Sequence, residues 1–556
     1  MVWAALMLAQ SWTGSLPELI ANLTAAMEHP FDIRWTEHSL MTILACTGAY
    51  LMGICLYAGQ QGRTRDGEEH GSAAWASPRQ VDAMFAQKQN KLLTRNVRLG
   101  LDTHKHRRSL NVLVIGGSGA GKSRSYVMPN ILEANTNYVI TDPKMEVLTA
   151  TGGWLKQNGY DIRVLNLVNL EQSDGYNPFH YIRDEKDALR LVNNLIQATT
   201  PKNSHENDPF WTKAETALLQ AIILMLWQEA PEYEQNFSMV MRVLEYAEVK
   251  EEDDEYVSPL DLLFQSMERE TPKSVAVRQY RVFKQAAGKT ARSILVSAAV
   301  RLAPFNLPQV QAITDHDDMD LYTLGEKKCA LYAVIPDNDN SFNFLVSLLY
   351  AQAFQALYYS ADQIHHGALP CHVHFILDEF AAMPLPGFTR ELATMRSRNI
   401  SASTIIQNMA QIKELYRDSW ETIPGNSDTI LYLGGNEQAT HKYISEALGK
   451  STINTKTHSQ SKGKSGSWST NFQQSARELL TPDEVRMLDN RYAILFIRGA
   501  KPVMDLKYDL TKHPAIRHTV NGGGPPYIHH QKKPETWLSG EPLFAPEEAE
   551  IIIEKE

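Results

Sequence analysis

The segment at residues 116–123 reads Gly-Gly-Ser-Gly-Ala-Gly-Lys-Ser and matches every fixed position of the phosphate-binding loop pattern G-x-x-x-x-G-K-[ST]. The run at residues 110–115 directly before it is largely apolar and β-branched, which is typical of a buried parallel strand. Glycines let backbone N–H groups curl around an oxyanion without Cβ clashes. A strand followed by such a loop predicts an α/β fold that holds the phosphates of a nucleoside triphosphate.

Two side chains at the end of this loop have expected roles of their own. Lys122 can reach the β- and γ-phosphates, and the Ser123 hydroxyl can ligate Mg²⁺. A chance glycine-rich loop is the alternative, and the preceding strand makes it the weaker interpretation. The predicted phosphate-binding residues are Gly116, Gly117, Ser118, Gly119, Ala120, Gly121, Lys122 and Ser123.

The overall charge limits how the chain can contact nucleic acid. Its 556 residues carry a net charge of −10, so the chain as a whole is not a basic nucleic-acid binder. Any DNA contact must then be local, in a pore or a groove. The length suggests about three or four domains. The 4 cysteines show no paired spacing, which indicates a reducing compartment for most of the chain.

An uncharged stretch near the N-terminus is long enough to cross a membrane. No Asp, Glu, Lys or Arg occurs from residue 39 to residue 62, and a helix over residues 39–59 can span a hydrocarbon core of about 30 Å. Arg63 and Arg65 follow directly, whereas acidic residues precede the stretch, which places its C-terminal side in the cytoplasm. The apolar start within residues 1–12 is too short to span alone and predicts a signal-like or partial first membrane helix. A buried core helix is the alternative interpretation of the longer stretch.

The alternation of strand and helix patterns along the chain predicts its domains. Strand-like runs separated by helical stretches indicate a parallel sheet. Over residues 182–302 the strand signals vanish and helical periodicity takes over, which indicates an all-helical insertion. The predicted domains are a membrane anchor at 1–65, a nucleotide-binding α/β domain at 66–181 and 303–515, an all-α inserted domain at 182–302 and a flexible acidic tail at 516–556.

Two segments of biased composition interrupt this pattern. The acidic run at residues 251–255 is expected to be a solvated linker between helices, with a docking surface for a basic partner as the alternative. The stretch at residues 459–475 is rich in Ser, Lys and Gly and predicts a flexible loop. Its Lys462, Lys464 and Trp468 can alternatively track a single nucleic-acid strand in a pore.

A predicted strand ends in two carboxylates, Asp378 and Glu379. In phosphate-loop enzymes an aspartate at this point holds the hydration shell of Mg²⁺, so Asp378 is a predicted metal residue together with Ser123. Glu379 can polarise the attacking water as a general base. A strand that ends in Asp-Glu is a weak signal alone and a strong one downstream of a complete phosphate-binding loop. The pair therefore indicates hydrolysis of the nucleotide rather than its storage.

The predicted catalytic residues are Lys122 and Glu379 together with three further side chains, Gln407, Arg396 and Arg398. Gln407 ends a short apolar strand and can sense the γ-phosphate or orient water. Arg396 or Arg398 can act across a subunit boundary as a finger that stabilises charge. An ion pair at a helix end is the alternative for either arginine.

The order of these motifs resembles the type IV secretion coupling proteins, the TraG/TraD-like conjugation ATPases. The resemblance spans most of residues 39–510, and the combination of motifs is far more specific than any one of them. Besides the phosphate-binding loop, it is carried by Thr141-Asp142-Pro143-Lys144, Asp208-Pro209-Phe210-Trp211, Ile376-Leu377-Asp378-Glu379-Phe380, Gln407-Asn408-Met409-Ala410-Gln411, Gly425-Asn426-Ser427-Asp428-Thr429 and Leu480-Thr481-Pro482-Asp483-Glu484.

This resemblance implies a fold, ligands and partners. The implied fold is a RecA-like P-loop ATPase domain with an inserted all-α domain and an N-terminal transmembrane anchor, assembled as a hexameric ring that hydrolyses ATP with Mg²⁺. The implied substrate is single-stranded DNA with its relaxase, and the implied partners are type IV secretion channel proteins in the inner membrane of a bacterium. Most of the chain then faces the cytoplasm. The family usually has two full membrane helices, whereas this chain shows one clear one.

Two other functions stay open on the sequence alone. The first is a ring translocase that pumps DNA in chromosome segregation, although the chain after Leu510 shows no helix-turn-helix pattern. The second is a membrane receptor that recruits secretion substrates, in which ATP only orders the structure. Glu379 argues against the receptor, because a general base has no use without hydrolysis.

Overall fold

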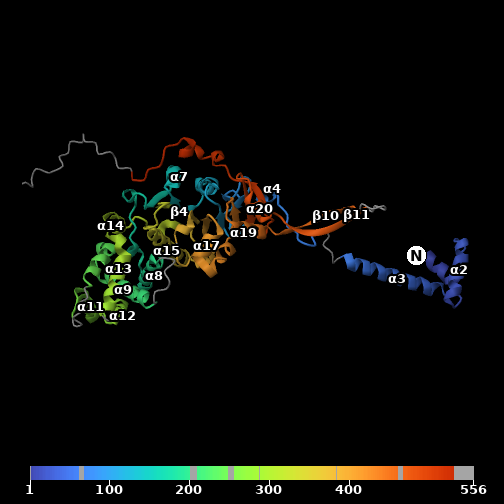
Figure 1. Ribbon diagram of the computed structural model, residues 1–556, viewed down its shortest axis with the longest axis horizontal. Helices are drawn as coiled ribbons and strands as arrows, with labels where there is room; N and C mark the ends of the chain where they lie inside the picture. Colours follow the sequence, from blue (N-terminus) through green and yellow to red (C-terminus); the bar gives the residue numbers. More distant parts are fainter. Residues whose placement is uncertain are drawn as a thin grey trace, which may run out of the picture. The chain divides into compact units, whose positions relative to one another are not determined.

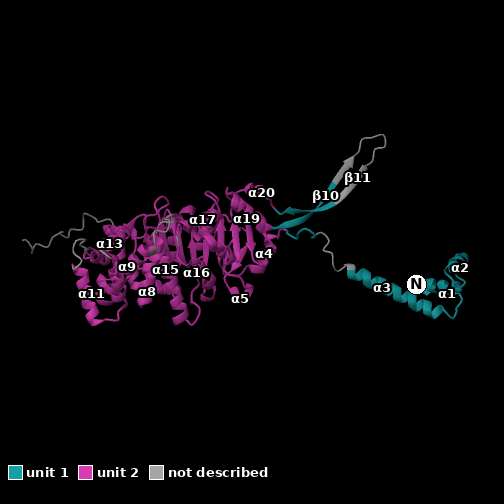
Figure 2. Ribbon diagram, turned by 60° about the horizontal axis from the view of Figure 1, so that its bottom comes forward, with its two compact units in different colours: residues 1–73, 449–479 teal, residues 74–448, 480–556 magenta. Residues whose placement is uncertain are grey.

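The structure is a computed structural model, and its described part divides into two compact units. One unit holds residues 1–73 and 449–479, and the other holds residues 74–448 and 480–556 (Figure 2). The residues that the structure describes are 2–61, 68–200, 209–247, 256–286, 288–383, 385–460 and 468–530.

The first unit begins with three helices, α1 (Val2–Ser11), α2 (Leu16–Glu28) and α3 (Ser39–Gln61). Within the described residues, α3 is the one helix long and apolar enough to cross a membrane, with a mean hydropathy of 1.8 over Ser39–Gly59. Only 6% of its most apolar window is buried inside the protein, which argues against a core helix. The apolar helix α1 packs beside α3 but is too short to span a membrane by itself.

The first unit also contains a two-stranded antiparallel hairpin where the sequence predicts a loop. Strand β10 (Lys450–Gln460) pairs with β11 (Trp468–Glu478), from Lys450 opposite Glu478 to Gln460 opposite Trp468 (Figure 2). The loop prediction for residues 459–475 is therefore wrong for 459–460 and 468–475. Both strands are mainly polar, so they lack the alternation of apolar and polar residues that reveals a half-buried strand. Lys462 and Lys464 lie outside the described residues.

A nine-stranded sheet forms the centre of the second unit. Its order is β13-β12-β9-β3-β8-β7-β4-β6-β5, and it is parallel except where β12 pairs with β9 and β13. The strands from β3 to β8 are almost fully buried, as expected of a parallel sheet covered on both faces. The strands are β3 (Val112–Ile115), β4 (Asn137–Pro143), β5 (Asp161–Asn166), β6 (Cys329–Ile335), β7 (Val373–Leu377), β8 (Ile400–Ile406), β9 (Thr429–Tyr432), β12 (Tyr492–Ile497) and β13 (Val503–Leu506), beside the separate pair β1 (Asn90–Leu92) and β2 (Arg98–Gly100).

The register of this sheet decides which strand ends lie together. Ile115 of β3 pairs with Ile406 of β8, and Leu377 of β7 pairs with Thr404 of β8. Because parallel strands bring their carboxyl ends to one edge, the loops that follow β3, β7 and β8 converge there. The helices around the sheet are α4 (Pro78–Phe85), α5 (Thr103–His106), α6 (Met128–Leu132), α7 (Glu146–Gln157), α15 (Asn343–Tyr359), α16 (Phe388–Thr394), α17 (Met409–Tyr416), α18 (Thr422–Gly425), α19 (Gln438–Leu448) and α20 (Pro482–Arg486).

A group of helices interrupts the sheet between β5 and β6. Helix α9 packs against α8, α12 and α13, and Figure 1 shows these helices gathered at one end of the unit. A buried ion pair at 2.6 Å between Arg301 and Glu215 ties α13 to α9. The acidic run at 251–255 lies outside the described residues, as does Asp208. The helices are α8 (Glu185–Thr199), α9 (Pro209–Glu229), α10 (Phe237–Glu245), α11 (Pro259–Glu270), α12 (Val275–Lys284), α13 (Gly288–Leu302) and α14 (Pro308–Thr314).

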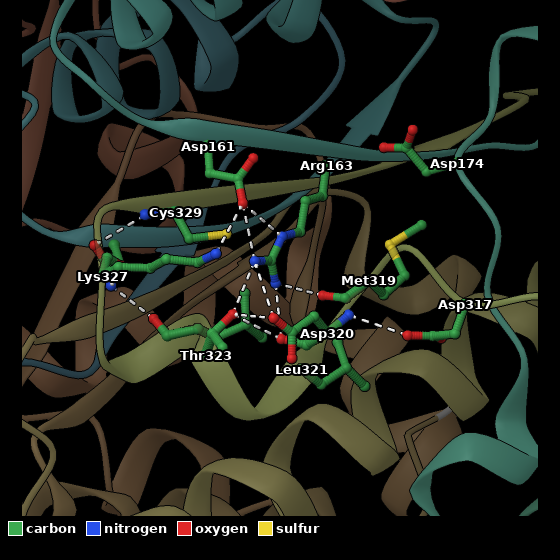
Figure 3. A network of polar contacts seen from close by, with 12 residues as sticks. Asp161, Arg163, Asp174, Asp317, Met319, Asp320, Leu321, Thr323, Lys327 and Cys329 are labelled. Carbon is green, nitrogen blue, oxygen red and sulfur yellow. Dashed lines mark hydrogen bonds and ion pairs between the residues drawn. The ribbon is translucent and has the colours of Figure 1, made fainter.

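A buried arginine fastens the chain where it returns from these helices to the sheet. The Arg163 guanidinium on β5 donates to the backbone oxygens of Met319 and Asp320 and to the Thr323 hydroxyl (Figure 3). It also pairs with Asp161 at 2.9 Å. Because its donors reach several acceptors, this buried cation is well satisfied. The network holds the return segment against the edge strand β5.

The segment at residues 516–530, predicted as part of a flexible tail, packs against helix α7. The His518 ring lies 4.7 Å from the Trp154 ring, centre to centre, and the Tyr527 N–H donates to the Thr149 oxygen at 3.0 Å. Gly152 leaves room for the Tyr527 ring, because a Cβ there would approach that ring to 2.6 Å. The tail prediction is thus wrong for these residues, since scattered aromatic and histidine side chains give no periodic signal. Residues 531–556 lie outside the described part.

Candidate nucleotide site

The phosphate-binding loop joins the buried strand β3 to a helical segment that starts at Ser123. Gly119 and Gly121 have φ angles of +75° and +85°, which L-residues with a Cβ rarely adopt. Gly116 and Gly117 donate their N–H groups to the backbone oxygens of Ile406 and Gly434, at 3.0 and 2.9 Å. These two bonds fix the start of the loop to the strand ends beside it. The Ala120 N–H donates to the Gly117 oxygen at 3.1 Å, which closes a tight turn within the loop. Backbone N–H groups of such turns are the usual donors to a bound phosphate.

The carboxylate of Asp378 lies against the end of the loop. The Ser123 hydroxyl donates to Asp378 Oδ2 at 3.0 Å, across 255 residues of sequence. Asp378 is buried, and this burial, together with the nearby charge of Glu379, raises its pKa to about 6. A hydroxyl and a carboxylate at one point are hard oxygen ligands of the kind that Mg²⁺ prefers.

Glu379 lies between Lys122 and Gln407. The Lys122 Nζ is 3.5 Å from Glu379 Oε1, and the Gln407 amide donates to both Glu379 oxygens at 3.2 and 2.9 Å. The φ angle of Glu379 is +50°, a left-handed conformation that is unusual for a residue with a side chain. Such conformations cluster where a side chain must be aimed at a site. The structure therefore brings five of the sequence-predicted residues together: Lys122, Ser123, Asp378, Glu379 and Gln407.

The two arginines differ from this group and from each other. Arg398 forms a two-point ion pair with Asp362, at 2.9 and 2.8 Å, and lies 4.4 Å from the centre of the Tyr358 ring. Arg396 is exposed and has no side-chain partner within the described part of the chain. Neither arginine contacts Lys122 or Glu379 among the described residues. Arg398 thus matches the ion-pair alternative, and Arg396 is the one with a free guanidinium.

Lys507 contacts the phosphate-binding loop, although no motif in the sequence indicates this contact. It follows β13, and its Nζ donates to the Ala120 oxygen at 2.8 Å and to Asn490 Oδ1 at 2.7 Å. Burial lowers the pKa of Lys507 to about 8. A hollow of about 200 Å³ opens beside it, next to Arg124 and Tyr508. A cation and an aromatic ring next to the loop suit the sugar and base of a nucleotide.

Asp142 lies one residue before the end of strand β4 and has different hydrogen-bond partners from those of Asp378. Its two oxygens accept the N–H groups of Val147 and Leu148, at 3.0 and 2.6 Å, where helix α7 begins. Burial raises its pKa to about 7, and the two N–H donors oppose this rise. The carboxylate is thus used by the helix start rather than by the nucleotide site.

Comparison with known proteins gives a consistent result. A family model described as type IV secretory system conjugative DNA transfer matches residues 66–510. Similar curated proteins include VirD4 of Rhizobium radiobacter, 24% identical over 70% of this chain and 55% of the relative. Another is the conjugal transfer protein TraG of Rhizobium radiobacter, 22% identical over 70% of this chain and 60% of the relative. The chain spans 55% to 65% of the length of the VirD4 relatives.

Solved structures with the same fold include two of conjugative coupling proteins. The bacterial conjugative coupling protein TrwBdeltaN70, in its unbound monoclinic form, superposes with a TM-score of 0.59 at 17% identity, over 79% of this chain and 94% of that one. The plasmid coupling protein TrwB in complex with ADP and Mg²⁺ gives 0.59 at 16% identity, over 79% and 94%. This likeness confirms the predicted RecA-like α/β fold.

Proposed function

Because the chain belongs to the type IV secretory system conjugative DNA transfer family, we propose that it is a membrane-anchored coupling ATPase. It recruits a relaxase bound to single-stranded DNA and delivers the complex to a type IV secretion channel in the inner membrane. The observation that carries the proposal is the convergence of Lys122, Asp378, Glu379 and Gln407 at the end of the phosphate-binding loop.

Each residue of this group has a distinct role in the proposed hydrolysis. The loop N–H groups and Lys122 hold the β- and γ-phosphates, and phosphate oxygens draw the ammonium away from Glu379. Ser123 and Asp378 hold Mg²⁺, which neutralises charge on the phosphates when bound. Glu379 then accepts the proton of the attacking water. Gln407 keeps the Glu379 carboxylate in place through its two hydrogen bonds.

The location and the DNA contact rest on separate observations. Helix α3 anchors the chain, and the arginine bias after residue 62 puts the motor on the cytoplasmic side. The net charge of −10 means that DNA is held by a local basic lining rather than by the surface as a whole. A hexameric ring supplies such a lining, because six copies repeat a short basic element around one channel.

ATP turnover by the full chain in detergent tests the proposal. Single-stranded DNA is expected to stimulate turnover, and the Lys122→Ala variant gives the background, since it lacks the phosphate-binding ammonium. Stronger stimulation by double-stranded than by single-stranded DNA would instead favour a chromosome-segregation translocase. If the chain bound ATP tightly but did not hydrolyse it, with or without DNA, the motor function would be refuted. The membrane receptor that uses ATP only to order its structure would then be the remaining function.

The ring makes a further test possible, because Arg396 is free to complete a neighbour's site. Arg396→Ala is expected to bind nucleotide and to lose turnover by about 10³-fold or more. Mixing it with Lys122→Ala should restore some turnover, since some interfaces then pair an intact loop with an intact arginine. Arg398→Ala is the matched control, because its guanidinium is held by Asp362. Full activity of Arg396→Ala alone would exclude the role in trans.

A further inference from the structure

Two histidines of the C-terminal segment face one buried carboxylate at the edge of the sheet. Nε2 of His529 lies 2.9 Å from both oxygens of Asp174, and Nε2 of His530 contacts Asp174 Oδ1. The three ligand atoms lie within 4.8 Å of one another. Asp174 follows the edge strand β5, whereas the phosphate-binding loop follows β3 in the middle of the sheet. This cluster is therefore separate from the nucleotide site.

The carboxylate and one imidazole are already held in position. Asp174 donates its N–H to the Val164 oxygen at 2.8 Å, and its Oδ2 accepts the Val164 N–H at 2.7 Å. The Tyr527 hydroxyl lies 3.1 Å from Nδ1 of His529. A partner on the second ring nitrogen is what orients a metal-binding histidine and sets its tautomer. Asp174 and His529 are buried, while His530 reaches solvent and leaves a path for an ion.

We propose that Asp174, His529 and His530 form a binding site for a divalent transition metal of the zinc class. Two imidazole nitrogens and one carboxylate oxygen are a ligand set that suits Zn²⁺, with a fourth position left to water. Ligand atoms around tetrahedral zinc lie roughly 3.3 Å apart, so the contact between His529 and Asp174, at 2.9 Å, needs to open by only a few tenths of an ångström, and the His530 ring has to move outward further. Mg²⁺ is not the expected ion, because it prefers oxygen ligands.

The metal fastens the C-terminal segment to the body of the motor unit. Among the described contacts, Tyr527 also holds this segment, through the hydrogen bond of its N–H to Thr149 and through its ring over Gly152. His530 adopts a left-handed φ of +46°, which aims its ring at Asp174. Since zinc binds only when the segment is docked, zinc shifts the segment towards its docked state by mass action.

Zinc binding by the full chain in detergent, stripped of metal with a chelator, tests the site. Calorimetric titration with Zn²⁺ is expected to show one site per chain that His529→Gln and Asp174→Asn lose. Titration with Co²⁺ should give the visible absorption of a four-coordinate ion. His518→Gln is the matched control, because His518 lies in the same segment but stacks on Trp154 and faces no carboxylate. It is expected to bind zinc like the wild type.

Hydrogen exchange gives a second readout that does not depend on catalysis. With free Zn²⁺ at 100 times its dissociation constant, exchange of the Tyr527 amide should slow by roughly 100-fold in the wild type and in His518→Gln. In His529→Gln zinc should leave this exchange unchanged. Equal zinc uptake by the wild type and His529→Gln, or no effect of zinc on Tyr527 exchange, would overturn the proposal. His529→Gln lies outside the nucleotide site, so its retained ATP binding shows that it is folded.

Discussion

Strands β4 and β7 are neighbours in the sheet and end in the same way, yet their ends serve different purposes. Thr141 pairs with Leu377, so Asp142 and Asp378 follow at the same level. Both carboxyl groups are buried, and burial raises the pKa of both, to about 7 and about 6. Position at the carboxyl edge of a parallel sheet therefore yields a buried carboxylate in either case.

The difference lies in the residues that follow each aspartate. After Asp142, Lys144 and Met145 take left-handed conformations and helix α7 begins at once, so its first N–H groups turn back to the carboxylate. After Asp378 the chain turns at Glu379 instead, and the carboxylate faces the hydroxyl of Ser123. A strand-end aspartate is thus free for a ligand only when no helix start captures it.

The largest expected effect is the loss of turnover when Lys122, the loop cation that contacts Glu379 beside the end of β7, is removed. Lys122→Ala should reduce ATP turnover by roughly 10³-fold or more, because Lys122 is the ammonium that pairs with Glu379 in the described structure and its loss leaves phosphate charge unbalanced. Conjugative transfer should be lost while insertion into the membrane is kept. Lys144→Ala is the control at the end of β4, since Lys144 pairs with the exposed Asp337. If Lys122→Ala and Lys144→Ala lost turnover equally, the end of β4 would serve the nucleotide site as the end of β7 does, and the comparison would fail.

Glu379→Gln should lower turnover by roughly 10²-fold or more and leave ATP binding intact, because it removes a general base but keeps the shape. The variant retains an oxygen for the Gln407 amide, so the site should stay assembled. Glu414→Gln, an exposed change on α17, serves as the control. Single-turnover kinetics separate binding from hydrolysis. If the Glu379→Gln variant kept its turnover, Glu379 would not be the general base and another residue would activate the water.

The sequence predicts the part of the site that is encoded by contiguous motifs. The loop and the strand before it place Ser123, and the parallel pattern puts Asp378 at the same edge, because every parallel strand ends there. Lys507 could not be found in this way, since it directly follows an antiparallel strand and reaches Ala120 across 387 residues of sequence. The contact of His529 with Asp174 could not be predicted either, because it joins residues 355 positions apart that share no motif. Strand order and long-range docking leave no periodic signal, whereas a motif does.

Asp142→Asn should cost about 2 kcal/mol of stability around α7 and leave turnover per folded molecule unchanged. An amide offers one oxygen, so either Val147 or Leu148 loses its acceptor and its buried N–H stays unpaired. Hydrogen exchange of the α7 amides at about pH 5 measures the loss locally. Asp378→Asn gives the opposite pattern, with α7 exchange unchanged and Mg²⁺-dependent turnover reduced. An equal loss of turnover in both variants would contradict the comparison.

The prediction with the least consequence for activity concerns pH: the loss of stability that Asp142→Asn causes should depend on it. The pKa of Asp142 is about 7 in the folded protein and lies above its ordinary value of 3.8, so folding takes up a proton between these pH values. Its contribution to stability is fully present below about pH 4 and is lost as the pH rises to about 7. The Asp142→Asn variant has no titratable carboxyl group at this position, so its stability lacks this dependence on pH.

The stability difference between wild type and Asp142→Asn should therefore narrow between about pH 5 and pH 8. We expect a change of about 1.4 kcal/mol for each pH unit between about pH 5 and pH 7, because over that range the folded protein holds a proton that the unfolded chain has released. Exchange of the α7 amides in both proteins, measured across this pH range, tests it. A difference that stays constant would mean that the helix start holds Asp142 ionised throughout. The end of β4 would then differ from the end of β7 in protonation as well as in partners.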